Sequence, residues 1–431
     1  MINSQQPVVM PITVARRMFM SSGLTKAARY GAVLWMALLF GASFTVNAAP
    51  GVEATAAANP QSGQVQTVYL EYGEVGYSFI NWGLPLVTRS TPFAKEPALA
   101  GSKVVRGTFQ PGGSASNSIA FAWDRAAGKL YLDLNRNLDL TDDPAGVFGC
   151  REKNYSRHYQ TFTNVRLPFK TPSGNREMLV DLNLNDYGSR INCTAAVRSF
   201  WQGKATLQGA DRQVGIVGNS FDKFDSPAGG HLLLRPWAER NKSFNTYSGS
   251  LDAFPFPRKL FVQNHAYQLD CTNESQGDSS RLKLQFTGQQ PALGELKITG
   301  DFIQRMILQD GPNLVVVDQP EPVVKIPAGR YHQPGVWLKK GDAEAYRDSG
   351  PLRPDKWITV DGKNPAVLAA GGPLTNSVSL SRHGKSLRFN YQLLGAGGEV
   401  YQLTRQDRSQ PPEFAVYKGD RKIASGKFEF G

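Results

Sequence analysis

The sequence predicts an all-β protein in which two or three β-sandwich or barrel-like domains follow a cleaved N-terminal leader. Three observations favour this fold class. Short segments alternate apolar and polar residues, turn residues separate these segments, and no long stretch has helical periodicity. The 43 glycines and 27 prolines among 431 residues also favour frequent turns over long helices.

The first 48 residues are typical of a secretory signal peptide. Residues 1–29 carry four basic and no acidic residues, and the apolar run AVLWMALLFGASF follows at 32–44. The run is short for a membrane-spanning helix, so we expect cleavage after Ala48, with an uncleaved anchor as the alternative. The mature protein is then secreted or periplasmic and has no transmembrane segment, and residues 49–64 form a flexible lead-in.

Three domains are expected after the lead-in: a β domain at 65–200, a second β domain at 201–320 and a basic, immunoglobulin-like β domain at 321–431. The proline-rich segment DQPEPVVKIPAG marks the last boundary. Residues 322–431 contain 17 Lys and Arg against 10 Asp and Glu, so the positive charge is concentrated there.

Strand patterns recur along the whole chain. The segments IAFAWD and KLYLDL flank RAAG as a β-hairpin. Alternation also predicts strands within TVYLEYG, KATLQGADRQVGIVG, KLFVQNHAYQLDC, RLKLQFTG, SVSLSRHGKSLRFNY and EFAVYKGDRKIASGKFEF. Short helices are expected only near 91–101 and 351–357, where prolines limit them.

The chain has three cysteines, Cys150, Cys193 and Cys271. In an oxidising compartment they allow one disulfide. We prefer the pair Cys150–Cys193 because both residues lie in the first expected domain, and three free thiols are the alternative.

One stretch concentrates acidic residues in a chain that is otherwise basic. The segment DLNRNLDLTDD at 133–143 holds four aspartates and two asparagines. Carboxylates this close together repel one another, and a hard cation that prefers oxygen ligands removes the repulsion. The predicted ligands of a structural calcium ion are Asp133, Asn135, Asn137, Asp139, Asp142 and Asp143. The alternative is an Asx-rich turn, which these residue types form without metal.

The spacing D-x-N-x-N-x-D resembles the calcium loop of EF-hands, and resembles still more its helix-poor versions in dockerins and thrombospondin type 3 repeats. The resemblance implies that Asp133, Asn135 and Asn137 donate side-chain oxygens. It implies a backbone carbonyl ligand at Asp139. The similarity covers eleven residues and implies the ion, not the EF-hand fold. The chain as a whole also resembles exported bacterial proteins of uncharacterised function.

Two positions depart from this calcium-loop pattern. Leu138 stands where a glycine normally makes the sharp turn. Pro144 stands where a glutamate normally binds the ion with both oxygens, so Asp142 or Asp143 would have to take that role.

The functional expectation is an exported calcium-binding β-protein of the cell envelope or extracellular space with a structural or binding role. One alternative is a carbohydrate-binding or adhesive module, which predicts exposed aromatic side chains lined up on one sheet face. The other is a polysaccharide hydrolase, which predicts a groove with two facing carboxylates. The aromatic segments at 199–203, 235–241 and 254–261 fit core packing better than a binding surface.

Enzyme signatures are not evident in the sequence. The five histidines are not spaced as a metal pair, and there is no G-x-S-x-G motif. The basic residues are dispersed, which is typical of an ordinary soluble surface of mixed charge. The alternative is attraction to a partner, an envelope polyanion or a glycan. Nucleic acid is not expected, because no nucleic-acid-binding motif occurs.

Overall fold

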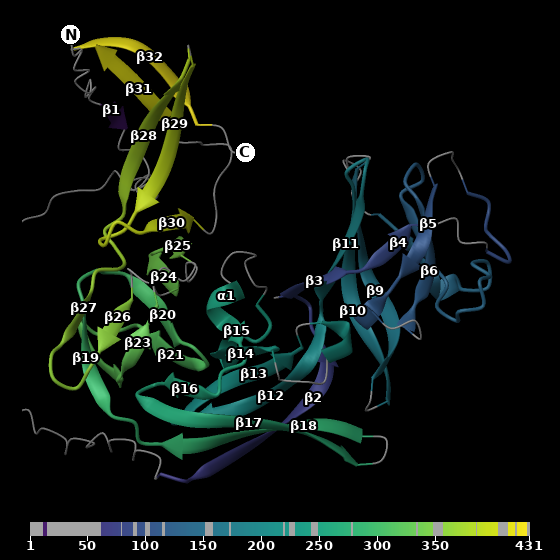
Figure 1. The fold of residues 1–431 in the computed structure, drawn as a ribbon, viewed down its shortest axis with the longest axis horizontal. Coiled ribbons are helices and arrows are strands. Elements are labelled where there is room, and N and C mark those ends of the chain that lie inside the picture. The colour runs from purple at the N-terminus through teal and green to yellow at the C-terminus, as the bar shows by residue number, and fades with distance from the viewer. Residues whose placement is uncertain are drawn as a thin grey trace, which may run out of the picture. The chain divides into compact units, whose positions relative to one another are not determined.

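The structure is a computed structural model that describes residues 12–14 and most of 62–428 (Figure 1). Within the second range it does not describe 79, 89–92, 100–103, 114–116, 151–157, 172–173, 219, 224–228, 243–248, 277–278, 333–334, 348–356, 385, 404–412 and 419. The expected signal peptide, apart from 12–14, and the lead-in up to 61 lie outside the described residues.

The all-β prediction is confirmed. In the described part of the chain, the only α-helix is the four-residue α1 (Gly249–Asp252), and short 3-10 turns are the other helical elements. No helix among these residues is long and apolar enough to cross a membrane.

The chain forms two compact units. The larger unit comprises 59–375 and 393–405, and the smaller comprises 1–58, 376–392 and 406–431. These bounds differ from the expected divisions at 200 and 320, which stay predictions. Strand β12 (Ser199–Leu207) runs across the first of these divisions.

One long sheet forms the base of the larger unit. Its neighbouring strands are, in order, β15 (Ala253–Pro255), β14 (His231–Pro236), β13 (Ala210–Val217), β12, β2 (Val65–Glu74), β18 (Ser279–Gln289), β17 (His265–Gln276), β16 (Lys259–Val262), β21 (Asn313–Asp318), β20 (Ile303–Asp310), β24 (Gly335–Lys340), β25 (Ala343–Arg347) and β30 (Val400–Leu403). Neighbours are antiparallel except β16 and β21, which are parallel. Residues from opposite ends of the sequence therefore share one sheet.

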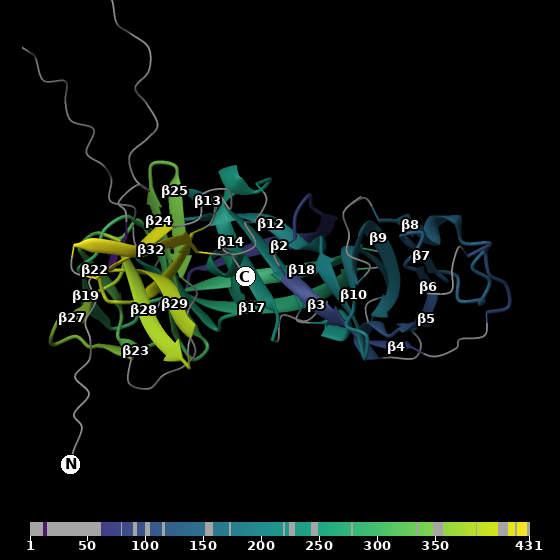
Figure 2. The same cartoon turned by 90° about the horizontal axis from the view of Figure 1, so that it is seen from above.

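Two smaller sheets lie side by side at one end of this unit (Figures 1 and 2). The first has the order β3 (Ile80–Leu84), β11 (Ile191–Val197), β10 (Gly174–Asp186) and β9 (Tyr159–Thr171). The second has the order β4 (Leu86–Thr88), β5 (Val104–Phe109), β6 (Ile119–Asp124), β7 (Lys129–Leu132) and β8 (Val147–Gly149). The acidic segment connects β7 to β8.

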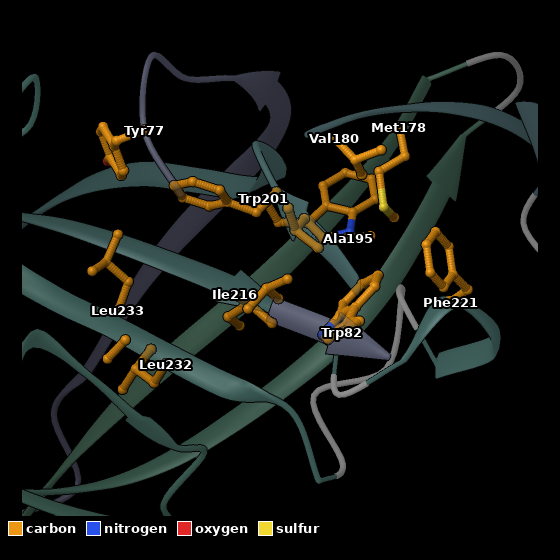
Figure 3. Close-up of a cluster of buried hydrophobic side chains, with 14 of the residues drawn as sticks. Tyr77, Trp82, Met178, Val180, Ala195, Trp201, Ile216, Phe221, Leu232 and Leu233 are labelled. Carbon is orange, nitrogen blue, oxygen red and sulfur yellow. The ribbon is translucent and has the colours of Figure 1, made fainter. Parts of the chain in front are cut away.

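Both small sheets and half of the long sheet share one hydrophobic core. Figure 3 shows part of it, with Trp82 and Phe221 in edge contact and Trp201 near Val180. The sheets' inward faces bury the apolar half of each alternating pattern, as in Leu182 and Leu184 of β10. Phe200, Trp201 and Phe254 are buried, which supports the core interpretation of the aromatic segments.

A second core covers the other half of the long sheet. It includes residues of the three-stranded sheet β22 (Val323–Pro327), β19 (Leu293–Ile298) and β27 (Ala366–Leu368), and of the pair β23 (Gly329–Tyr331) and β26 (Ile358–Val360). Strand β19 illustrates the pattern, because its residues alternate between exposed and buried along the strand.

The smaller unit is built from two strand pairs. Strands β28 (Thr375–His383) and β29 (Ser386–Leu394) lie beside β31 (Glu413–Lys418) and β32 (Arg421–Lys427), and β1 (Ile12–Val14) pairs with β31. Residues 393–394 of β29 belong to the larger unit, where they pair with β30. None of the described side chains at 376–392 and 413–428 is fully buried.

Two local expectations are corrected. Residues 93–99 form no helix, because backbone groups of Ala94 and Lys95 bond instead to the acidic segment. The Cys150–Cys193 disulfide is wrong, since all three cysteines are free. Cys193 lies in β11 and Cys150 follows β8, so the two belong to different sheets. Of the other expected helix, 351–356 lies outside the described residues.

Candidate functional site

The acidic loop, residues 133–143, is anchored to its surroundings at Asp133 and at Leu140. The N–H of Asp133 donates to the carbonyl of Ala120 in β6 over 2.9 Å. Leu140 is buried in a small cluster with Ala122 and Tyr131. Its N–H donates to the carbonyl of Lys95 over 3.0 Å, which holds the loop against residues 94–95. The loop is therefore a fixed part of the five-stranded sheet.

Two residues of the acidic loop have left-handed backbone conformations. The φ angle is 65° at both Arg136 and Leu138. Leu138 therefore makes the turn that a glycine makes in the EF-hand pattern. A non-glycine residue in this region costs about 1–2 kcal/mol, so the hydrogen bonds of the loop must offset that strain.

The Asp133 carboxylate is the centre of these hydrogen bonds. Asp133 is 1% exposed. Oδ1 accepts the N–H of Asn137 and Oδ2 accepts the N–H of Leu138, each over 3.1 Å. A buried carboxylate that accepts backbone N–H groups is a stable local structure even without another ligand.

Asn135 and Asn137 connect the turn around the Asp133 carboxylate to the side chain of Asp142. Asn135 Oδ1 accepts the N–H of Asn137 over 3.0 Å, and Asn137 Oδ1 accepts the N–H of Asp139 over 2.7 Å. Their amide groups donate to the two oxygens of Asp142 over 3.1 and 2.6 Å. Asn135, Asn137 and Asp142 are exposed, so this part of the network faces solvent.

Asp139 and Asp143 lie at the margins of the network. Asp139 Oδ1 accepts the N–H and the hydroxyl of Thr141 over 2.8 and 2.6 Å, and these bonds hold the Asp139 pKa below its ordinary value. Asp143 Oδ2 accepts the N–H of Leu134 over 3.1 Å. Burial raises the pKa of Asp143, and the nearby carboxylates of Asp133 and Asp142 raise it further.

The structure thus joins four of the six predicted ligands, Asp133, Asn135, Asn137 and Asp142, in one hydrogen-bond network. It holds Asp143 at the margin and turns Asp139 toward Thr141. Within the described part of the chain, no three His, Cys, Asp or Glu side chains are grouped as a metal site. The loop has the bonding of successive Asx turns, which was the alternative expectation. No calcium site is shown by this arrangement, and the ion belongs to the proposal below.

A buried charge network in the larger unit was not predicted from the sequence. Arg305 in β20 is 3% exposed and ion-pairs with Asp252 at the end of α1. Its Nε lies 2.6 Å from Asp318 Oδ1, and Arg212 Nη1 lies 3.1 Å from Asp318 Oδ2. The Arg305 guanidinium also donates to backbone carbonyls of Leu234 and Leu251. It therefore ties α1 to the long sheet.

The carboxylates of this network have opposite pKa shifts. Burial raises the pKa of Asp252 more than Arg305 and Arg235 lower it. Burial also acts to raise the pKa of Asp318, but Arg305 and Arg212 outweigh it and hold the value below the ordinary range. No sequence signal marked these residues, because the paired charges lie far apart in the chain.

The described aromatic side chains do not form the row expected of a carbohydrate-binding face. The large exposed ones are Tyr69, Tyr159, Tyr187 and Phe302, which come from four separate segments. Trp237, from one of the aromatic segments, is partly exposed and has Arg240 and Lys204 over its ring, at 4.8 and 5.6 Å from the centroid.

Comparison of the chain with protein-family models, with curated proteins and with solved structures found no match.

Proposed function

We propose that the protein is an exported β-protein of the cell envelope or extracellular space, with a structural or binding role, in which the acidic loop holds a calcium ion. Two features support this proposal. The N-terminal charge and hydropathy pattern is that of a signal peptide. The acidic loop gathers carboxylate and amide oxygens at a fixed place beside β7.

The clustering of oxygens carries the calcium proposal: the asparagines Asn135 and Asn137 join the turn at Asp133 to Asp142, and Asp143 lies beside them. In agreement, burial and the carboxylates of Asp133 and Asp142 raise the pKa of Asp143, so its ionised form is held at a cost in free energy. A divalent cation among these oxygens removes that cost. Calcium accepts six to eight oxygen ligands in irregular geometry, and Asp133, Asn135, Asn137, Asp142 and Asp143 offer the oxygens that would hold it.

Bound calcium would serve structure at this position. A ligand that binds only the native state stabilises it by mass action, by about 2.7 kcal/mol at a concentration 100 times the Kd. The acidic loop joins β7 to β8 and contacts residues 94–95. Ligation would therefore stabilise the five-stranded sheet and its contacts with the loop.

Thermal unfolding with calcium, magnesium or EDTA tests the proposal. Millimolar calcium should raise the Tm, and magnesium should raise it less because it prefers small, regular coordination shells. Asp142→Asn should abolish most of the calcium shift, since Asp142 is exposed and can lose its charge without unfolding the loop. The matched control is Asp342→Asn, an exposed aspartate in the turn between β24 and β25. Equal Tm values in calcium and EDTA would refute the metal site.

Export has its own test. N-terminal sequencing of the protein recovered outside the cytoplasm should find a chain that begins after Ala48. An exported chain that still carries Trp35 would contradict cleavage at that site.

A further inference from the structure

The smaller unit carries exposed basic residues on two turns. One turn joins β28 to β29, and the other joins β31 to β32. The residues that define this basic tip are Arg382 and Arg388, which flank the first turn, and Arg421 and Lys422, which follow the second, and the described acidic residue beside them is Asp420. The excess of positive charge is therefore local.

Ring contacts place both turns at the same end of the unit. Phe389 in β29 stacks on Phe414 in β31 with 4.8 Å between centroids, and Tyr391 lies 5.3 Å from Phe428. Tyr391 lies farther along β29 from the first turn than Phe389 does. Phe428 follows the end of β32 and lies farther from the second turn than Phe414, whose ring centroid is 5.2 Å away. Both turns therefore project on the same side of the aromatic cluster.

The described basic side chains of the tip are exposed. Arg382, Arg388, Arg421 and Lys422 all face solvent. None of the four makes an ion pair with another residue that the structure describes; the one such pair within this unit joins Lys427 to Glu413. Like charges gathered in this way raise the local potential and attract an anionic partner.

We propose that the basic tip binds an anionic polysaccharide. Arginine forks bind carboxylate, phosphate or sulfate groups with two parallel hydrogen bonds, and a polymer with repeated anionic groups can engage both turns at once. The inference rests on the proposed location outside the cytoplasm, where such polymers occur, and is independent of calcium binding.

The arrangement of apolar side chains favours a polymer over a lipid surface. A protein that docks on a membrane usually offers an apolar face beside its basic residues. In this unit Phe389, Phe414 and Phe428 face one another and are partly buried. Leu380 and Ile423 are exposed singly, at 45% and 49%, which is ordinary for a soluble surface.

The test compares dextran sulfate with dextran, two polymers with the same glucan backbone and different charge. Binding of the exported protein is measured by calorimetry in EDTA at low and at physiological salt. The test variant replaces the four described residues with glutamine (Arg382→Gln, Arg388→Gln, Arg421→Gln and Lys422→Gln). The control replaces four exposed lysines of the larger unit, and so changes the net charge equally (Lys170→Gln, Lys259→Gln, Lys297→Gln and Lys363→Gln).

The proposal predicts binding to dextran sulfate, no binding to dextran, and weakening as salt rises. The test variant should lose about tenfold or more in affinity, by analogy with other contacts to polyanions, and the control should change little. The double variants Arg382→Gln with Arg388→Gln, and Arg421→Gln with Lys422→Gln, should each lose part of the affinity.

Three results would overturn the inference. Equal losses in the test and control variants would indicate a general charge effect. A loss in only one double variant would refute a site shared by the two turns. Binding to vesicles of phosphatidylglycerol and phosphatidylcholine, without binding to dextran sulfate, would assign the tip to a lipid surface. Because every measurement is made in EDTA, none of these results depends on calcium in the acidic loop.

Discussion

The buried carboxylate of Asp133 accepts a hydrogen bond from the backbone N–H of Leu138, with 3.1 Å between Oδ2 and N. This bond closes the turn in which Leu138 has a φ of 65°. The same turn brings the side chains of Asn135 and Asn137 onto Asp142. The strained leucine and the buried aspartate therefore depend on each other, and both determine the shape of the acidic loop.

Leu138→Gly should preserve or increase stability. Leu138 is 38% exposed, so its removal loses little apolar burial, and glycine adopts the left-handed conformation without a Cβ clash. The gain should be a few tenths to about 1 kcal/mol after glycine's greater entropy in the unfolded chain is counted. Urea unfolding measures the change.

Leu140→Ala is the control for Leu138→Gly in the same loop. Leu140 is 2% exposed, so the truncation should cost about 2–4 kcal/mol. A large loss from Leu138→Gly, comparable to that from Leu140→Ala, would mean that the leucine side chain matters more than the backbone conformation.

Asp143→Asn should change how stability depends on pH. The folded-state pKa of Asp143 is raised, so its contribution to stability is present at low pH and is lost as pH rises through that folded pKa. Without calcium, the variant should be as stable as the wild type at neutral pH or more stable by up to about 1 kcal/mol, because the amide oxygen still accepts a hydrogen bond.

The measurement for Asp143→Asn is the free energy of unfolding from pH 3 to pH 7 in EDTA. The difference between variant and wild type should grow in favour of the variant as pH rises through the folded pKa of Asp143 and should level off above it. A variant that is less stable than the wild type at pH 7 in EDTA would contradict the assigned repulsion. Calcium should reverse the order, because the wild type then gains more than the variant.

Arg305→Met should destabilise the larger unit strongly. The substitution leaves the carboxylates of Asp252 and Asp318 with fewer cationic partners in a buried setting. Removing one partner of a buried ion pair costs about 3–5 kcal/mol. Lys297→Met, at an exposed position of β19, should have little effect in the same urea unfolding experiment. Similar small changes in both variants would show that the network contributes little.

The cysteines should behave as free thiols. Burial raises the pKa of Cys193, and raises that of Cys271 to about 12, so neither forms a reactive thiolate near neutral pH. Alkylation of the native protein at pH 8 should spare both, and alkylation after denaturation should label all three cysteines. A denatured, unreduced chain in which two cysteines resist labelling would indicate a disulfide instead.

Local structure was predictable where adjacent residues determine it. The hairpin of β16 and β17 turns at Gln263 and Asn264, which have φ angles of 51° and 63°. Alternating residues on both sides of such a turn define the register from sequence alone. The hairpins β6–β7 and β12–β13 were predicted in the same way.

Long-range order was not predictable from the same patterns. Strand β2 pairs with β12 on one side and with β18 on the other, and no local feature of residues 65–74 selects these distant partners. Contact with the acidic loop also determines the backbone conformation of 93–99. Lys95 forms an isolated β-bridge with Asp139, and no helix forms there. In the acidic loop, the sequence predicted candidate ligands, which stay a prediction, but not which N–H or O–H group each oxygen accepts. Arg305 was missed because its partners lie in α1 and β21.

Calorimetric titration of the exported protein with calcium tests the central claim most directly. The account predicts saturable binding of one ion with a Kd low enough for millimolar calcium to fill the site, and at least tenfold weaker binding in Asp142→Asn but not in Asp342→Asn. The absence of any binding at millimolar calcium would contradict it and leave the acidic loop as a self-sufficient series of Asx turns.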